Sequence, residues 1–376
     1  MCGIAGFYNF EEHYMYEKEK WTHLLNQMNL AQKRRGPDDE GTYLSDTCGL
    51  AHVRLKIVDF KTGAQPMIRK EGSRECAIVF NGEIYNMHQL KSELLSEGAT
   101  FRTASDTEVL LTGYMLHGKE YIKKLNGIFS IALYDSFTKQ LLLVRDRLGV
   151  KPLFYTKLGN TLVFASELKG LFAYPGVKAQ VDSEGLCEIF ALGPARTPGL
   201  GVFKNISEVL PGHWMIFDRE TQRSEAYWSL ESHPHEDSFE DTLEKTGALV
   251  EDAVKLQMMS DVPISTFLSG GLDSSLVTAI CAKELQKQGK VLDTFSFDFS
   301  NNHKYFSSNA FQPSEDRPYA EAMAAFAKTN HRFLECTNED LVTVLYQAVD
   351  ARDLPCMADI ESSMLYFCSQ VTDYNK

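Results

Sequence analysis

Residues 51–58 read AHVRLKIV, and their side chains alternate between apolar and polar. A period of two predicts a β-strand with one face in the core and the other face available for contacts. The core side would carry Val53, Leu55 and Ile57, and the other side would carry His52, Arg54 and Lys56.

Similar patterns, separated by Gly, Asn and Asp turn signals, recur through the first 230 residues. They predict further strands at 3–8, 77–81, 128–134, 141–145 and 161–165. Helical spacing of apolar residues interrupts them at 21–28 and, less regularly, at 109–113. Strands covered by helices on both sides predict an α+β fold with an αββα sandwich.

The remainder of the chain alternates strands with longer helices, which is a different fold class. Residues 263–275, PISTFLSGGLDSS, predict a buried strand, a glycine turn and a helix from about Ser274. Strands at 292–297 and 332–334 follow, so we expect an α/β domain with a doubly wound parallel sheet. The predicted domains span 2–229 and 239–376, and the polar, Pro-containing stretch within 230–238 predicts a linker.

Composition excludes several classes of protein. The chain has 376 residues and a formal net charge of −13, which makes nucleic acid a poor partner. Its eight cysteines include no CxxC pair, which argues against a disulfide framework or a thiolate metal site and favours a reducing, cytoplasmic compartment. No apolar run is long enough to span a membrane, and Glu11 and Glu12 come too early for a signal peptide.

Cys2 is the first candidate for catalysis. Removal of Met1 would place a thiol and a free α-amine on one residue, and an α-amine is neutral at pH 7 far more often than a lysine. One residue could then supply both nucleophile and base. The alternative is that Cys2 is a small buried hydrophobic residue.

Six motifs occur in a fixed order in the first domain: CGIAGF, RRGPDDEG, AHVRL, NGEIYN, SDTE and RDRLGVKPLFY, at 2–7, 34–41, 51–55, 81–86, 105–108 and 145–155. This series resembles the class II glutamine amidotransferases, a family of N-terminal nucleophile hydrolases. The resemblance implies that Cys2 attacks the side-chain amide of glutamine. It also implies that the Asn81 side chain and the Gly82 N–H form the oxyanion hole.

The charges in these motifs match free glutamine. Arg54 would hold the α-carboxylate, and Glu83 and Asp106 would face the α-ammonium. Each residue also has a structural interpretation: Arg54 as an exposed strand charge, Asp106 as a helix N-cap, and Asn81-Gly82 as a hairpin turn. Gly36 and Pro37 would shape the loop over the site.

The second candidate site is the glycine turn at 269–275. Backbone N–H groups at such a turn can face an anion at a helix N-terminus, although the GxxxxGK[ST] spacing of a Walker loop is absent. The string SGGLDSS resembles the pyrophosphate loop of the ATP pyrophosphatases, of the adenine nucleotide α-hydrolase type. The resemblance implies that pyrophosphate is held by Ser269, Gly270, Gly271, Asp273, Ser274 and Ser275.

The same resemblance implies further nucleotide contacts. Asp273 would help to position Mg²⁺, and backbone groups of Leu268 and Phe297 would contact adenine. Asp298 would contact a metal or ribose, or cap the strand end. A loop without a ligand is the alternative interpretation.

The order of the two domains resembles the glutamine-hydrolysing asparagine synthetases. The resemblance implies glutamine, aspartate and ATP as substrates, a β-aspartyl adenylate intermediate and an apolar passage for ammonia between the sites. It also implies, by analogy, a homodimer. The alternatives are a synthetase acting on another carboxylate, and a binding or regulatory protein that has kept the fold.

Members of this family continue beyond the length of this chain with a second acidic loop of the type SGEGSDE. We therefore expect a fragment that retains glutaminase activity and has weak or no synthetase activity.

Overall fold

The computed structural model describes residues 1–193, 195–310, 313–355 and 360–374. The chain divides into two compact units, Met1–His233 and Pro234–Lys376. Each unit is described by itself below. No helix among the described residues is both long and apolar enough to cross a bilayer.

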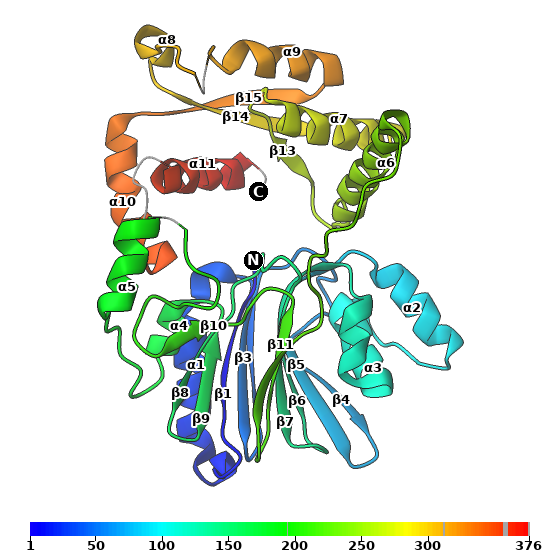
Figure 1. Ribbon diagram of the computed structural model, residues 1–376, viewed down its shortest axis with the longest axis vertical. Helices are drawn as coiled ribbons and strands as arrows, with labels where there is room; N and C mark the ends of the chain where they lie inside the picture. The colour runs from blue at the N-terminus through cyan, green and yellow to red at the C-terminus, as the bar shows by residue number, and fades with distance from the viewer. Residues whose placement is uncertain (194, 311–312, 356–359, 375–376) are drawn as a thin grey trace. The chain divides into compact units, whose positions relative to one another are not determined.

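The first unit contains two six-stranded antiparallel sheets (Figure 1). One sheet has the order β10-β8-β9-β1-β3-β2. Its strands are β1 (Gly3–Tyr8), β2 (Asp39–Leu44), β3 (Cys48–Arg54), β8 (Phe154–Leu158), β9 (Thr161–Ala165) and β10 (Ile206–Glu208). The other has the order β12-β11-β7-β6-β5-β4. Its strands are β4 (Met67–Glu71), β5 (Arg74–Ile84), β6 (Gly127–Asp135), β7 (Gln140–Arg145), β11 (His213–Phe217) and β12 (Gln222–Ala226).

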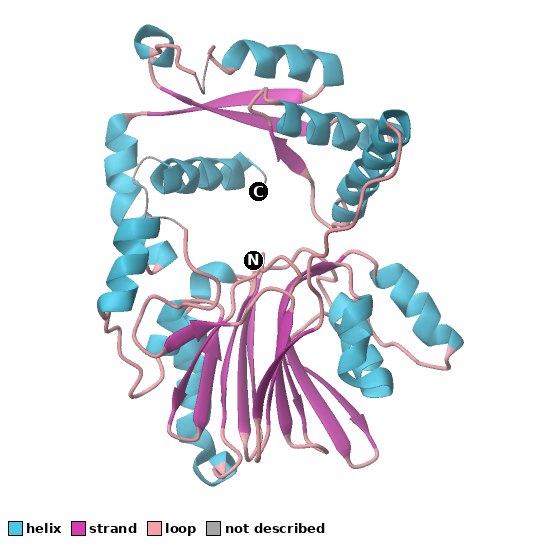
Figure 2. Ribbon diagram, viewed as in Figure 1, coloured by secondary structure: helices cyan, strands magenta, loops and turns pink. Residues whose placement is uncertain are grey.

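Helices cover the outer faces of both sheets (Figure 2). Helix α1 (Lys18–Ala31) packs on the first sheet with α4 (Leu168–Phe172), and α3 (Asp106–His117) packs on the second beside α2 (Met87–Ser96). The remaining helical segments are η1 (Tyr14–Glu17), η2 (Lys33–Arg35), η3 (Gly118–Lys124), α5 (Ser183–Cys187) and η4 (Glu188–Leu192). The predicted αββα sandwich is confirmed.

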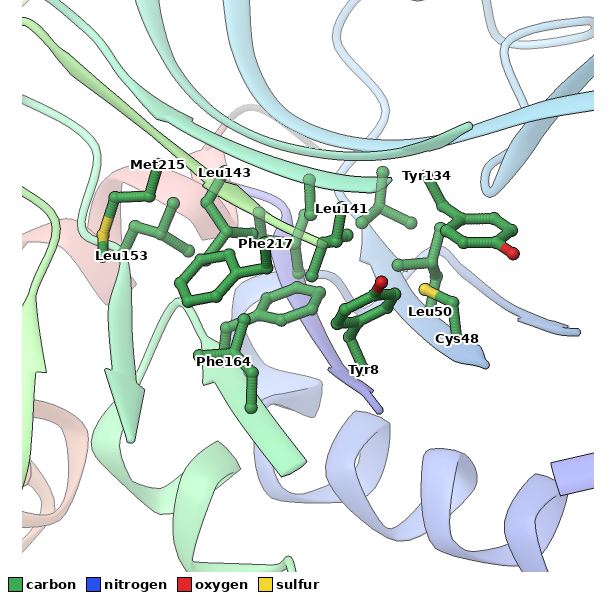
Figure 3. Close-up of a cluster of buried hydrophobic side chains, with 14 of the residues drawn as sticks. Tyr8, Cys48, Leu50, Tyr134, Leu141, Leu143, Leu153, Phe164, Met215 and Phe217 are labelled. Carbon is green, nitrogen blue, oxygen red and sulfur yellow. The ribbon is translucent and has the colours of Figure 1, made fainter. Parts of the chain in front are cut away.

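The core of this unit lies between the two sheets (Figure 3). Leu50 and Phe164 from one sheet meet Leu141 and Leu143 from the other. All four side chains are fully buried. Aromatic rings also pack outside this layer, where Trp21 of α1 lies 5.4 Å from Phe7, between ring centroids. Burial of such apolar area supplies the main driving force for folding.

The prediction for residues 51–58 is partly wrong. The strand ends at Arg54, and both of its faces are buried because β3 lies under α1 on one side and against the second sheet on the other. His52 is 0% exposed, and its Nε2 lies 3.2 Å from the Phe80 carbonyl oxygen of β5. The polar face is therefore part of the interior that surrounds the candidate site.

The second unit contains the parallel sheet β13-β14-β15, formed by Ser265–Phe267, Asp293–Phe299 and Asn330–Cys336. Its helices are α6 (Phe239–Gln257), α7 (Leu272–Lys287), α8 (Asn302–Tyr305), α9 (Arg317–Ala327), α10 (Asn338–Arg352) and α11 (Ile360–Tyr374). The predicted α/β class with a parallel sheet is confirmed. The predicted buried strand at 263–268 is shorter and lies at the sheet edge, where Phe267 is 45% exposed.

Candidate active site

Cys2 immediately precedes β1, and its side chain faces the end of β3. Its Sγ accepts a hydrogen bond from the Leu55 N–H at 3.4 Å and donates to the Leu55 carbonyl at 3.7 Å. Burial raises the pKa of the Cys2 thiol, while the Leu55 backbone contact and the nearby amine and Arg54 oppose that effect. The thiol is therefore fixed in place and needs a base before it can attack.

A cavity of about 60 Å³ surrounds this thiol, and we call it the thiol pocket. All six residues predicted for the glutamine site line it: Cys2, Arg54, Asn81, Gly82, Glu83 and Asp106. They come from the residue before β1, from β3 and β5, and from the start of α3, so the fold brings together residues up to 104 positions apart in sequence. Gly36 and Pro37 do not line the pocket.

Arg54 is buried, so its interpretation as an exposed strand charge is wrong. Its Nη2 donates to the carbonyls of Val58 at 3.2 Å and Asp59 at 2.6 Å. The Asp59 carboxylate in turn accepts from Thr62 N at 2.8 Å and from Ala104 N at 3.2 Å. Burial raises the pKa of Asp59, but these hydrogen bonds lower it overall. They therefore favour the ionised form of the Asp59 carboxyl.

Asn81 and Gly82 lie inside the long strand β5, so the hairpin-turn interpretation is also wrong. A side chain at Gly82 would collide with the Ile128 carbonyl of the neighbouring strand β6, and glycine is therefore required by close backbone contact. The residue before Asn81 is held on both sides: Phe80 N donates to Gln65 Oε1 at 2.7 Å, and its carbonyl lies next to His52. Burial lowers the pKa of His52 to about 4, so this imidazole stays neutral.

Asp106 is the first residue of α3 and is not its N-cap. Ser105 is the cap, with its Oγ accepting from Thr107 N at 3.2 Å. Burial raises the pKa of Asp106 to about 6, against hydrogen bonds from Ile84 and Thr107 that lower it. Burial also raises the pKa of Glu83. Two carboxyl groups therefore line the pocket, and burial disfavours the charged form of each. A cationic group bound beside them would stabilise that charged form.

Arg35 holds the start of the chain in place. Arg35 Nε donates to the Cys2 carbonyl at 2.8 Å, and its Nη1 pairs with Glu167 at 3.2 Å. Burial lowers the pKa of the Met1 amine to about 6, with Arg35 and Lys151 acting in the same direction. The Met1 amine is therefore largely neutral at pH 7.

The glycine turn of the second unit is open and exposed. Gly271 caps α7 without a side-chain hydrogen bond, which leaves backbone N–H groups at the helix start. Ser269 Oγ and Ser274 Oγ lie 3.0 Å apart and fix the turn. Gly270 has a φ of 86°, and a side chain there would lie 2.6 Å from Ala320 N. Of the predicted residues, Ser269, Gly270 and Gly271 form the turn before α7, and Asp273, Ser274 and Ser275 lie in the first turn of this helix.

A second cavity, of about 270 Å³, lies at the carboxyl ends of β13 and β14. Leu268, Ser269 and Phe297 of the predicted nucleotide set line it, and Asp298 does as well. Gly270, Gly271, Asp273, Ser274 and Ser275 do not. Asp298 pairs with Arg317 at 3.5 Å and accepts from Phe299 N, so in this structure it is held by protein groups.

Several residues of the two cavities were missed from the sequence. Lys151, Gln65 and Gly63 line the thiol pocket, and Arg317 and Phe333 line the second cavity. Lys151 belongs to the motif RDRLGVKPLFY, which was a signal that could have pointed to it. The others lie outside the quoted motifs.

Comparison with known proteins finds relatives for both units of the chain. A family model described as "Glutamine amidotransferase domain" matches residues 1–228, and one described as "Asparagine synthase" matches residues 245–375. Asparagine synthetase [glutamine-hydrolyzing] 3 of Bacillus subtilis is 44% identical over 373 residues, which is 99% of this chain and 60% of the relative. A relative from Methanocaldococcus jannaschii is 34% identical over 91% of this chain and 67% of its own length.

The chain belongs to the glutamine-hydrolysing asparagine synthetase family. It spans about 60% of the length of the Bacillus subtilis asparagine synthetase named above. Asparagine synthetase [glutamine-hydrolyzing] 2 of the same organism is 35% identical over 91% of this chain and 45% of its own length. The solved glutamine phosphoribosylpyrophosphate amidotransferase of B. subtilis is 18% identical, covers 79% of this chain and 75% of that one, and has a TM-score of 0.43.

Proposed function

We propose that the first unit hydrolyses glutamine to glutamate and ammonia at Cys2. We also propose that the whole protein transfers this ammonia to aspartate activated by ATP, which yields asparagine, AMP and pyrophosphate. The observation that carries the proposal is the thiol pocket, where a fixed thiol, an amide donor, an arginine and two carboxylates converge. Family membership supports the same activity.

The pocket would bind glutamine by its charges. Arg54 has donors left after its two backbone contacts, and these would hold the α-carboxylate. Asp106 and Glu83 would hold the α-ammonium, because ionised carboxylates favour a cation at hydrogen-bond distance. This leaves the side-chain amide of glutamine at the Cys2 end of the pocket.

The reaction would start once Met1 is removed. The α-amine of Cys2 takes the thiol proton, and Sγ forms a bond to the amide carbon. Asn81 Nδ2 and the Gly82 N–H would stabilise the oxyanion, for which a single donor is commonly worth about 3 to 4 kcal/mol. The C–N bond then breaks, ammonia leaves with the proton from the amine, and water hydrolyses the thioester to glutamate.

The second unit would bind ATP at the glycine turn and in the cavity beside it. The N–H groups at the start of α7 suit the phosphates, and the cavity behind Leu268 and Phe297 suits adenine. Mg²⁺ is commonly held by one or two carboxylates together with substrate phosphates. Asp273 fits that role, because it is exposed in the first turn of α7 and no hydrogen bond to another described residue occupies its carboxylate. When bound, the ion would neutralise phosphate charge.

The cysteines that the structure describes are all free thiols. This supports a reducing, cytoplasmic compartment for the protein.

The test is glutamate release from glutamine by the purified chain, compared with Cys2→Ala. We expect the wild type to be active. The Cys2→Ala variant should be at least 10³-fold less active, roughly the scale of removing a nucleophile. Cys187→Ala is the matched control, because Cys187 is exposed and lies outside the pocket. Mass spectrometry must confirm removal of Met1. A processed wild type without activity, or an active Cys2→Ala protein, would refute the proposal.

A further inference from the structure

Lys151 is a buried lysine that forms no ion pair with any residue that the structure describes. Its side chain lines the thiol pocket, and the residue is only 7% exposed. Within the part of the chain that the structure describes, the only polar contact of its Nζ is with Sδ of Met1, at 2.9 Å. Burying an ammonium without an acceptor is costly, so a group kept in this state commonly acts on something else in the site.

The backbone holds Lys151 in this position from both ends. Its N–H donates to Asp146 Oδ2 at 2.9 Å, and its carbonyl accepts from Arg145 Nε at 3.0 Å. Asp146 also accepts from the N–H groups of Leu148 and Val150, so one carboxylate organises the whole turn. The hydrogen bonds of Arg145 and Asp146, both in the motif RDRLGVKPLFY, therefore fix the backbone of Lys151.

Charged groups from several elements surround Lys151 near the chain start. Burial lowers the pKa of Lys151, and the carboxylates of Glu83 and Asp146 and the Cys2 thiol oppose this. Beside burial, Lys151 and Arg35 lower the pKa of the terminal amine, while Cys2 and Asp38 raise it. The charged and titratable groups around this end of the pocket are Arg35 from η2, Asp38 before β2, Arg54 from β3, Glu83 from β5, Asp106 from α3, and Lys151 with Asp146 from the turn after β7.

We propose that Lys151 is a positioning residue for the chemistry at Cys2: its ammonium keeps the α-amine of Cys2 unprotonated and favours negative charge at the thiol. In this structure the thioether of Met1 lies against that ammonium. Removal of Met1 therefore has two effects, since it frees the amine and also uncovers Lys151. The inference rests on the proposed glutaminase function and adds a residue to it.

The experiment compares Lys151→Met and Lys151→Arg with the wild type, each shown by mass spectrometry to start at Cys2. Methionine keeps the length of the side chain and removes the charge, whereas arginine keeps the charge. We expect the acidic limb of kcat, measured at saturating glutamine so that the titration of Asp106 does not contribute through KM, to move up by about one pH unit in Lys151→Met, an about threefold loss at pH 6.5 that approaches about tenfold below pH 5. Activities should converge at high pH, KM for glutamine should change little, and Lys151→Arg should keep the wild-type limb.

A second readout does not depend on turnover. Alkylation of Cys2 by iodoacetamide should be slower in Lys151→Met than in the wild type at neutral pH, because less thiolate is present. Lys157→Met is the matched control, since Lys157 is an exposed residue of β8 outside the pocket. Its profile should equal that of the wild type.

Two results would overturn the inference. One is a Lys151→Met protein with the wild-type acidic limb and wild-type alkylation. The other is equal loss in both Lys151 variants with unchanged limbs, which would indicate packing alone. If no protein releases glutamate but alkylation still differs between Lys151→Met and the wild type, the glutaminase proposal fails and the effect of Lys151 on the thiol stands.

Discussion

At the scale of single residues, the thiol pocket holds charges that its surroundings disfavour. Asp106 has its pKa raised to about 6 by burial, whereas an unfolded aspartate titrates near 3.8. A raised pKa means that the folded state binds the proton more tightly than the unfolded state. The contribution to stability is present below about pH 4 and is lost as the pH rises through 6.

Asp106→Asn is therefore expected to stabilise the protein and to weaken substrate binding. The free energy of unfolding of residues 1–233 should rise by about 1 kcal/mol at pH 7.5, after allowing for partial exposure and loss of the helix-dipole contact. The gain should shrink at pH 4.5, because Asp106 is then protonated in the folded state. Urea titration at the two pH values measures this, and a variant that is less stable at pH 7.5 would contradict it.

The same substitution should raise KM for glutamine by about 10- to 100-fold, the range for a hydrogen bond to a charged group. In the wild type, KM should also rise as the pH falls through 6, because Asp106 becomes neutral. Steady-state glutaminase assays from pH 5 to 8 test both expectations. Glu184→Gln, an exposed carboxylate outside the pocket, is the control.

At the scale of elements, helix α3 presents Asp106 to the pocket through its cap. Ser105→Ala removes the oxygen that accepts from Thr107 N and should cost about 1 kcal/mol. Hydrogen exchange of the peptide that covers 105–117 should speed up accordingly, and KM for glutamine should rise with it. Ser105→Asp, which keeps a capping oxygen, should restore slow exchange. Equal exchange in the alanine and aspartate variants would show that the cap does not matter.

The spacing of apolar residues predicted those helices and strands whose limits depend on local sequence alone. Strand β9 has the predicted limits, and the predicted helix at 21–28 lies inside α1, where Leu24, Leu25 and Met28 are buried. Strand β3 ends at Arg54, because the chain then turns through Asp59, which has a φ of 52° and is held by Thr62 and Ala104. Such tertiary contacts leave no mark on the alternation of residues 51–58.

The site was predictable to the extent that motifs identified it. Cys2, Arg54, Asn81 and Asp106 were found through motif order, and the fold does bring them together. Lys151 lies in one of the motifs, but the motif gives it no role, because the role proposed for it depends on its burial and on its contacts with the other described residues. Those properties arise from contacts between residues about 150 positions apart.

At the scale of the whole molecule, the thiol pocket belongs to one of two compact units. All of its lining residues lie between Met1 and Lys151, within the unit Met1–His233. Residues 1–233 expressed alone should therefore hydrolyse glutamine with kcat/KM within about threefold of the longer chain, since separate compact units commonly fold alone. Glutamate release by both proteins at equal concentration measures this. A folded but inactive 1–233 protein would show that the second unit contributes to the site.

The position of Trp21 and the other tryptophans within the first unit has a practical consequence for spectroscopy. All three tryptophans of the chain, Trp21, Trp214 and Trp228, lie in the first unit, whereas tyrosines occur in both. Excitation at 295 nm would therefore report intrinsic fluorescence from the first unit alone. Circular dichroism at 222 nm would also follow the helices α6, α7 and α9 to α11 of the second unit. The two signals recorded during one denaturation would separate the unfolding of the amidotransferase unit from that of its neighbour without any engineered label.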